Sequence, residues 1–108
     1  MSSEHHHTEI HDLAFTRASI DSWRTKEGRH QNWPVVYTLS NDRSIYVGES
    51  LNAVSRMRQP LESPEKRGLR AVRIVIDERF NKSVCLDLES FLIRMFSGDG
   101  QYSVLNRN

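Results

Sequence analysis

The sequence predicts one domain of the mixed α/β class, more narrowly α+β. Helices flank a small, mainly antiparallel three-stranded sheet in the order β-β-α-β-α. Two short segments rich in β-branched and aromatic residues lie close together, separated by turn residues. Two later segments carry apolar residues at helical spacing. A chain of 108 residues can build one hydrophobic core but is too short for two ordinary domains.

The predicted strands follow from local composition. Residues 35–39 and 44–48 form a hairpin, because turn residues 40–43 separate two β-branched segments. A third strand is predicted over residues 69–76, where apolar residues alternate. The side chains expected on its inner face are Val72, Ile74 and Ile76.

The predicted helices follow from apolar residues at helical spacing. A short amphipathic helix begins near Thr16, before the hairpin. A second covers residues 51–61 directly after the hairpin, with Ser50 as its cap. The strongest covers residues 83–96 and ends at Gly98.

Polar residues dominate the beginning of the chain. We expect residues 1–12 to form a flexible segment ahead of a single domain at residues 13–108. Residues 104–108 lack a helix stop or a solvating tail, so we expect a domain excised from a longer protein, with a further domain after Asn108.

Composition excludes several classes of protein. No apolar run approaches the roughly 18 residues of a membrane span, and no secretory signal precedes the domain, so a cytoplasmic protein without a membrane partner is expected. The single cysteine, Cys85, excludes an internal disulfide and a four-cysteine zinc site. Lys and Arg exceed Asp and Glu by one, 15 against 14, so nucleic-acid binding must be argued from local clusters. One such basic stretch runs from Arg56 to Arg73, and either a phosphate track or a solvated surface explains it.

Five short features occur in an informative order. The hairpin strands contain Val35-Val36-Tyr37 and Tyr46-Val47-Gly48, and Arg56 follows eight residues after the glycine. Glu89 lies within the last predicted helix, and Asn106 lies near the end of the chain. This series resembles the GIY-YIG nuclease family over roughly residues 33–108, with valine in place of the usual glycine of the first motif.

Glu89 also stands out without the resemblance. On the wheel of helix 83–96 it lies away from the polar face, among apolar side chains. Burying an unpaired charge costs several kcal/mol or more, so a compensating cation or a polar cleft is expected beside Glu89. We favour a metal ion, and the alternative is an internal ion pair with an arginine such as Arg73.

Arg56 points away from the apolar stripe of its helix, so packing does not require it. It is therefore either a phosphate-binding guanidinium or an ordinary solvated arginine. Tyr37 and Tyr46 are either catalytic hydroxyls on one side of the sheet or ordinary sheet aromatics.

The resemblance implies an endonuclease that hydrolyses DNA phosphodiester bonds with one Mg²⁺ or Mn²⁺ ion on Glu89; RNA is not excluded. Tyr46 would relay or remove the proton of the attacking water, Tyr37 would support the water network, and Arg56 would clamp the phosphate. Asn106 would position the glutamate or the nearby backbone. The residues expected to contact nucleic acid are Gly48, Ser50, Arg58, Arg70 and Arg73.

Two positions depart from the family pattern. Glu49 replaces a lysine common in repair-type relatives, and Pro60 replaces a histidine found in restriction-enzyme-like members. If that histidine is the base, His30, Tyr46 or Tyr102 must act instead. The alternatives to a nuclease are a catalytically impaired nucleic-acid-binding module of the same fold and an interaction domain unrelated to nucleic acid.

Overall fold

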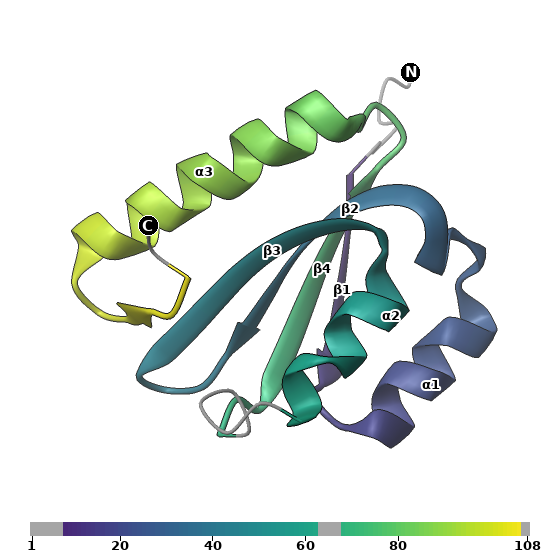
Figure 1. Cartoon of the computed structure of the whole chain (residues 1–108), viewed down its shortest axis with the longest axis horizontal. Helices are drawn as coiled ribbons and strands as arrows, with labels where there is room; N and C mark the ends of the chain where they lie inside the picture. The colour runs from purple at the N-terminus through teal and green to yellow at the C-terminus, as the bar shows by residue number, and fades with distance from the viewer. Residues whose placement is uncertain (1–7, 63–67, 107–108) are drawn as a thin grey trace, which may run out of the picture.

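A five-stranded mixed sheet forms the centre of the computed structural model, which describes residues 8–62 and 68–106. The strands are β1 (Thr8–Ala14), β2 (Gln31–Ser40), β3 (Ser44–Asn52), β4 (Ala71–Asp77) and β5 (Ser103–Val104). The helices are α1 (Arg17–Lys26), α2 (Ala53–Arg58) and α3 (Lys82–Asp99), with 3-10 turns at Gly28–His30 and Pro60–Glu62. The sheet order is β1-β4-β2-β3-β5, and among the strand pairs of the described residues the β3–β5 pair is parallel and the others are antiparallel. Figure 1 shows α1 and α2 on one side of this sheet and α3 on the other.

The α+β class is confirmed, but the sheet has five strands rather than three. β1 pairs with β4 over its whole length, so residues 8–12 belong to the sheet and not to a flexible segment. Their polar composition fits an edge strand, whose backbone is satisfied by β4 although few of its side chains are buried. The rest of that predicted segment, residues 1–7, lies outside the described residues.

The first helix begins as predicted, since Thr16 caps α1 by accepting a bond of 3.1 Å from the Ser19 amide. The second helix is shorter than predicted. β3 continues to Asn52, so Ser50 lies in the strand, where its hydroxyl accepts a bond of 2.9 Å from the Asn52 amide. The prediction of Ser50 as a helix cap was therefore wrong.

The last helix is longer than predicted. Asn81 caps α3 by accepting a bond of 2.8 Å from the Val84 amide. Gly98 lies inside the helix, and Gly100 ends it in the left-handed conformation, with φ of 80°.

Alternate residues of β2 pack into two separate cores. Val35, Tyr37 and Leu39 join the core under α1 and α2, whereas Val36 joins the core under α3. The first core also contains Ile20, Met57, Val72, Ile74 and Ile76, and the second contains Ile45, Val47 and Cys85. The strand residues thus point to opposite faces, and this decides which site residues can meet.

None of the helices in the described part of the chain is long and apolar enough to cross a membrane.

Candidate active site at the edge of the sheet

Tyr37 lies across from Gly48 in the β2–β3 register, and its ring covers the glycine. A Cβ atom on Gly48 would lie 2.5 Å from both Cζ and the hydroxyl oxygen of Tyr37, which is closer than real Cβ contacts. Tyr46 lies beside this pair, with its ring centroid 6.3 Å from that of Tyr37 and the planes tilted by 34°. The glycine therefore makes room for two neighbouring phenols on one face of the hairpin.

Charged groups from two helices act on the Tyr37 phenol. Its pKa is raised, mainly because the ring is only 1% exposed, and Tyr46 and Glu89 raise it further. Arg56 of α2 opposes this shift. Tyr37 is therefore protonated at neutral pH and suited to donate a hydrogen bond rather than to act as a base.

Glu89 is half-buried on α3, and desolvation is the main reason that its pKa is raised. The carboxylate of Glu49 adds to the shift, whereas Lys82 and Arg56 oppose it. Lys82 binds Glu49 closely, with its Nζ atom 2.7 and 2.9 Å from the two carboxylate oxygens. Two carboxylates and two cations thus influence one another here.

A hollow of about 360 Å³ adjoins these charges at the end of β3, beyond the two residues that pair with β5. Its lining combines the end of β3, the exposed side of α2 and the first residue of α3. The lining residues are Glu49, Ser50, Leu51, Asn52, Ser55, Arg56, Gln59 and Lys82. The hollow carries both positive and negative side chains and opens to solvent beside Arg56, which is exposed.

Asn106 is tied to the β3 backbone rather than to Glu89. Its Oδ1 atom accepts a bond of 3.2 Å from the Val47 amide, and its Nδ2 atom donates to the Val47 carbonyl. β5 pairs with β3 at Ser44 and Ile45, so the Asn106 amide extends this pairing by side-chain bonds. Asn106 thus anchors β3 between Tyr46 and Gly48.

The residues predicted to contact nucleic acid lie in different parts of the structure. Gly48 is covered by Tyr37, whereas Ser50 lines the hollow at β3. Arg58 forms an ion pair with Asp21, which joins α2 to α1. The two remaining arginines, at positions 70 and 73, line a different hollow.

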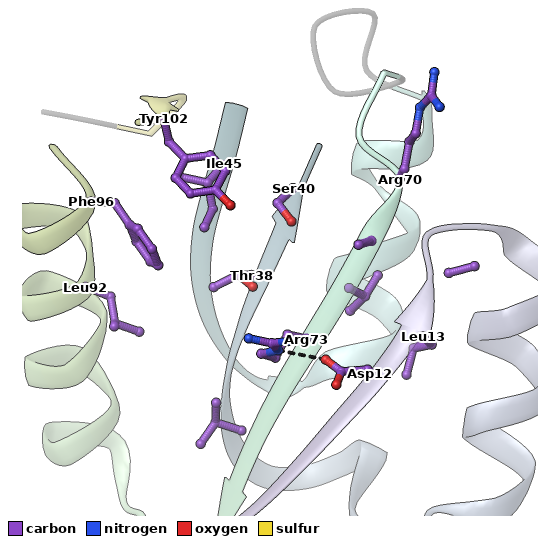
Figure 2. Close-up of a pocket in the computed structure, with 14 residues that line it drawn as sticks. Asp12, Leu13, Thr38, Ser40, Ile45, Arg70, Arg73, Leu92, Phe96 and Tyr102 are labelled. Atoms are coloured by element: carbon purple, nitrogen blue, oxygen red, sulfur yellow. Dashed lines mark hydrogen bonds and ion pairs between the residues drawn. The ribbon is translucent and has the colours of Figure 1, made fainter. Parts of the chain in front are cut away.

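That second hollow has a volume of about 740 Å³ and lies on the α3 side of the sheet (Figure 2). Arg73 is paired there with Asp12 at 2.7 Å. The alternative prediction of an ion pair between Arg73 and Glu89 was therefore wrong, because the partner of Arg73 is Asp12 of β1.

Two of the three residues considered as substitutes for the histidine lie away from the tyrosine pair. His30 lines a small hollow beside Arg58, and Tyr102 packs against Phe96 with ring centroids 5.6 Å apart. Tyr46 alone lies beside Tyr37. Pro60 is buried in a 3-10 turn after α2.

A group of ligand-type side chains that sequence reasoning missed joins β1 to the turn after α1. Ligand atoms of Glu9, His11 and Glu27 lie within 4.8 Å of one another. The Arg29 guanidinium already binds both carboxylates, at 2.8 and 2.6 Å, and the Trp23 indole donates to His11 Nδ1 at 2.9 Å. These contacts occupy the atoms that a metal would need. Alternation of His11 and Leu13 on one side of β1 was the sequence signal for this strand.

No match was found. None of the protein-family models, curated proteins or solved structures compared with this chain matches it.

Proposed function

We propose that this chain is a metal-dependent endonuclease domain of the GIY-YIG type, which hydrolyses phosphodiester bonds in DNA. One observation carries the proposal: Tyr37 and Tyr46 lie side by side over Gly48, with ring centroids 6.3 Å apart, and Arg56 of α2 and Glu89 of α3 both act electrostatically on the Tyr37 phenol. The proposed active-site residues are Tyr37, Tyr46, Arg56, Glu89 and Asn106.

Arg56 is the proposed phosphate ligand. It lies in the last turn of the short helix α2 and is exposed beside the 360 Å³ hollow, so packing does not require it. A guanidinium binds two phosphate oxygens through parallel hydrogen bonds, and its charge stabilises the transition state of hydrolysis.

The two tyrosines have different proposed roles. Tyr37 is buried and protonated, so it donates a hydrogen bond that orients its neighbour. Tyr46 is only half-buried and bonded to Tyr37, so its hydroxyl can contact a water molecule and relay the proton that this water loses. Asn106 keeps the Tyr46 segment of β3 in place through the Val47 backbone.

Glu89 is the proposed metal ligand. A poorly solvated carboxylate with a second carboxylate nearby favours a bound cation, so the residues fit one divalent ion. Mg²⁺ or Mn²⁺ bound there would place positive charge beside the phosphate and the leaving 3′ oxygen. Glu89 must lose its proton to bind this ion.

The ion pair of Glu49 with Lys82 bears on the first departure from the family pattern. The Glu49 side chain is 10% exposed and holds Lys82 through both oxygens. Its negative charge is therefore largely compensated by Lys82, and Arg56 supplies the excess positive charge of the hollow. Repulsion of a phosphate by Glu49 is correspondingly weak.

A plasmid-nicking assay with Mg²⁺ or Mn²⁺ tests the proposal. Wild-type protein should nick the plasmid, Glu89→Gln should abolish nicking, and Tyr46→Phe should reduce it by about a hundredfold or more, as for loss of a proton-transfer group. Asp87→Asn is the matched control, because Asp87 is an exposed carboxylate on the same helix. Nicking that survives Glu89→Gln unchanged contradicts the mechanism.

A catalytically impaired nucleic-acid-binding module is the second candidate, and Pro60 favours it. The described residues that line the hollow include no histidine that could act as a base. A Pro60→His variant that gains nicking activity would support this candidate. If both the wild type and Pro60→His bind DNA in a salt-dependent way and neither cleaves it, the chain is a binding module without catalytic function.

A further inference from the structure

A second hollow of about 740 Å³ lies on the face of the sheet opposite Tyr37 and Tyr46. It forms because α3 packs over β2 and β3, while β4 and β1 extend beyond the helix on this face. The floor comes from β1, β4 and β2, and one wall comes from the second half of α3. Its volume falls in the range typical of small-ligand sites.

The walls of this hollow differ in chemistry. Figure 2 shows Phe96 and Leu92 projecting from α3 on one side, and Arg73 with Asp12 on the other. Phe96 contacts Tyr102 edge to face, with ring centroids 5.6 Å apart and planes at 84°. The hollow therefore has an aromatic wall facing a charged one.

Hydroxyl groups lie between the two walls, on Thr38 and Ser40 of β2 (Figure 2). Both residues are half-buried, so their side chains remain accessible. Hydroxyls at this position can bind the polar edge of a base or a sugar oxygen.

Positive charge exceeds negative charge in this hollow, because Arg70 and Arg73 are accompanied by one carboxylate, Asp12. Asp12 binds the Nε atom of Arg73 at 2.7 Å and raises the pKa of the guanidinium, and the Tyr102 phenol contributes to this shift. Both partners of the pair are more than 60% exposed, at 62% and 63%, so a ligand can reach the guanidinium. Arg70 lies at the rim and extends away from the floor in Figure 2.

We propose that this hollow binds a nucleotide unit of a single-stranded nucleic acid, outside the active site. The base stacks on the aromatic wall of Phe96 and Tyr102, and Arg73 binds the adjoining phosphate. Arg70 at the rim binds the next phosphate. Acidic side chains of a peptide would bind the arginines but have no flat ring to cover the aromatic wall, whereas each nucleotide supplies both a phosphate and a ring, so the nucleic acid fits better.

This proposal deepens the proposed function and rests on it for the identity of the polymer. α3 carries Glu89 at one site and Phe96 at the other, seven residues or roughly 10 Å apart along the helix. One strand of a few nucleotides can therefore extend from the hollow to Glu89. The hollow would hold a single-stranded segment next to the cleavage site.

Binding of a short fluorescein-labelled oligothymidylate, measured by anisotropy in EDTA, tests the proposal. Arg73→Gln should weaken binding and reduce the slope of log affinity against log salt by about 0.7, because one phosphate contact is lost. Tyr102→Leu should weaken binding about tenfold through lost stacking. Asp12→Asn should tighten binding, because it removes the carboxylate that competes for Arg73.

Arg24→Gln is the matched control, since Arg24 is exposed on α1, on the other side of the sheet, and should leave the affinity unchanged. Thermal unfolding of each variant separates lost binding from lost folding. Wild-type affinity in both Arg73→Gln and Tyr102→Leu would overturn the proposal. Equal competition by polyglutamate, with no effect of Tyr102→Leu, would also overturn it and indicate an acidic peptide.

The test is independent of cleavage. Suppose that Glu89→Gln abolishes nicking but that substitutions of Arg73 and Tyr102 do not change oligothymidylate binding. This result would overturn only the second site. Binding that depends on these two residues in a protein without nicking activity would instead support this site and contradict the proposed catalytic function.

Discussion

The phenol of Tyr37 occupies the space that any side chain at Gly48 would need. The two residues face each other across β2 and β3, and a Cβ atom at position 48 would lie 2.5 Å from the Tyr37 ring and hydroxyl. Backbone conformation does not explain this glycine, because its φ is not positive. The glycine of the Tyr46-Val47-Gly48 motif is therefore explained by the tyrosine of the other motif.

Gly48→Ala should displace the Tyr37 ring and destabilise the protein by about 1–3 kcal/mol, as overpacking does in other cores. The variant should also lose nicking activity, because Tyr37 can no longer orient Tyr46. Urea unfolding and the plasmid assay measure the two effects.

Gly28→Ala is the control for this prediction, since nothing lies within 4 Å of a Cβ atom built at Gly28. In a Tyr37→Leu background, which removes the ring, Gly48→Ala should cost less than in the wild type. An equal cost in both backgrounds would show that the contact between Tyr37 and Gly48 is not its cause.

Local sequence signals predicted the hairpin and α3, but not the edges of the sheet. The β2–β3 turn and the apolar spacing of α3 depend on neighbouring residues, so a short window reveals them. β1 exists because it pairs with β4, more than 55 residues away in the chain. β5 has two residues, too few to produce a recognisable pattern.

In the candidate site too, local features could be predicted from the sequence and long-range contacts could not. Glu89 could be singled out because it interrupts an apolar helix face, which is a local property. The contact of Lys82 with Glu49 could not be predicted, because it joins α3 to β3 across 33 residues. From the sequence alone, Glu49 was therefore expected to repel a phosphate, because its pairing with Lys82 was not visible.

The Asn106 side chain leads to a pH-dependent prediction. In the wild type the Asn106 amide donates a hydrogen bond to the Val47 carbonyl. In Asn106→Asp, an ionised carboxylate can still accept from the Val47 amide but repels the Val47 carbonyl. Folding should therefore raise the pKa of the new carboxyl. Stability should be close to that of the wild type below the unfolded pKa of about 3.9, and should fall by about 1–3 kcal/mol as pH rises through the folded value.

Urea unfolding of Asn106→Asp at several pH values, compared with wild type, checks this. Asn106→Ala serves as the control, because it removes both bonds and has no titrating group, so its loss of stability should not depend on pH. An Asn106→Asp difference that is constant with pH would contradict the bonding of Asn106 to Val47.

The cluster at Arg29 predicts how acid affects stability. Arg29 is the main reason that the pKa of Glu9 is lowered from 4.5 to about 2, and it also lowers the pKa of Glu27. A lowered carboxyl pKa stabilises the fold above the unfolded value, and this contribution disappears as pH falls through the folded value. Arg29→Met should therefore lower the midpoint temperature of unfolding at pH 7. The difference in midpoint between the variant and the wild type should shrink as pH falls from 4.5 to about 2.

Thermal unfolding across this pH range measures the difference. Arg17→Met is the comparison, because Arg17 is an exposed arginine on α1 outside this cluster. A difference between Arg29→Met and wild type that persists unchanged at low pH would mean that Arg29 acts through packing, for example on Trp33, 6.0 Å from its guanidinium.

The ion pair of Glu49 with Lys82 gives the last prediction, in which its two members shift the pH dependence of cleavage in opposite directions. In the proposed mechanism cleavage requires ionised Glu89. The charge of Glu49 raises the pKa of Glu89, whereas that of Lys82 opposes the rise. Glu49→Gln should move the acid limb of the pH–rate profile to lower pH. Lys82→Met leaves Glu49 uncompensated and should move this limb to higher pH. Nicking rates at saturating Mg²⁺ measure both, with Asp87→Asn as the unshifted control, and shifts in the same direction would contradict the coupling of Glu89 to this pair.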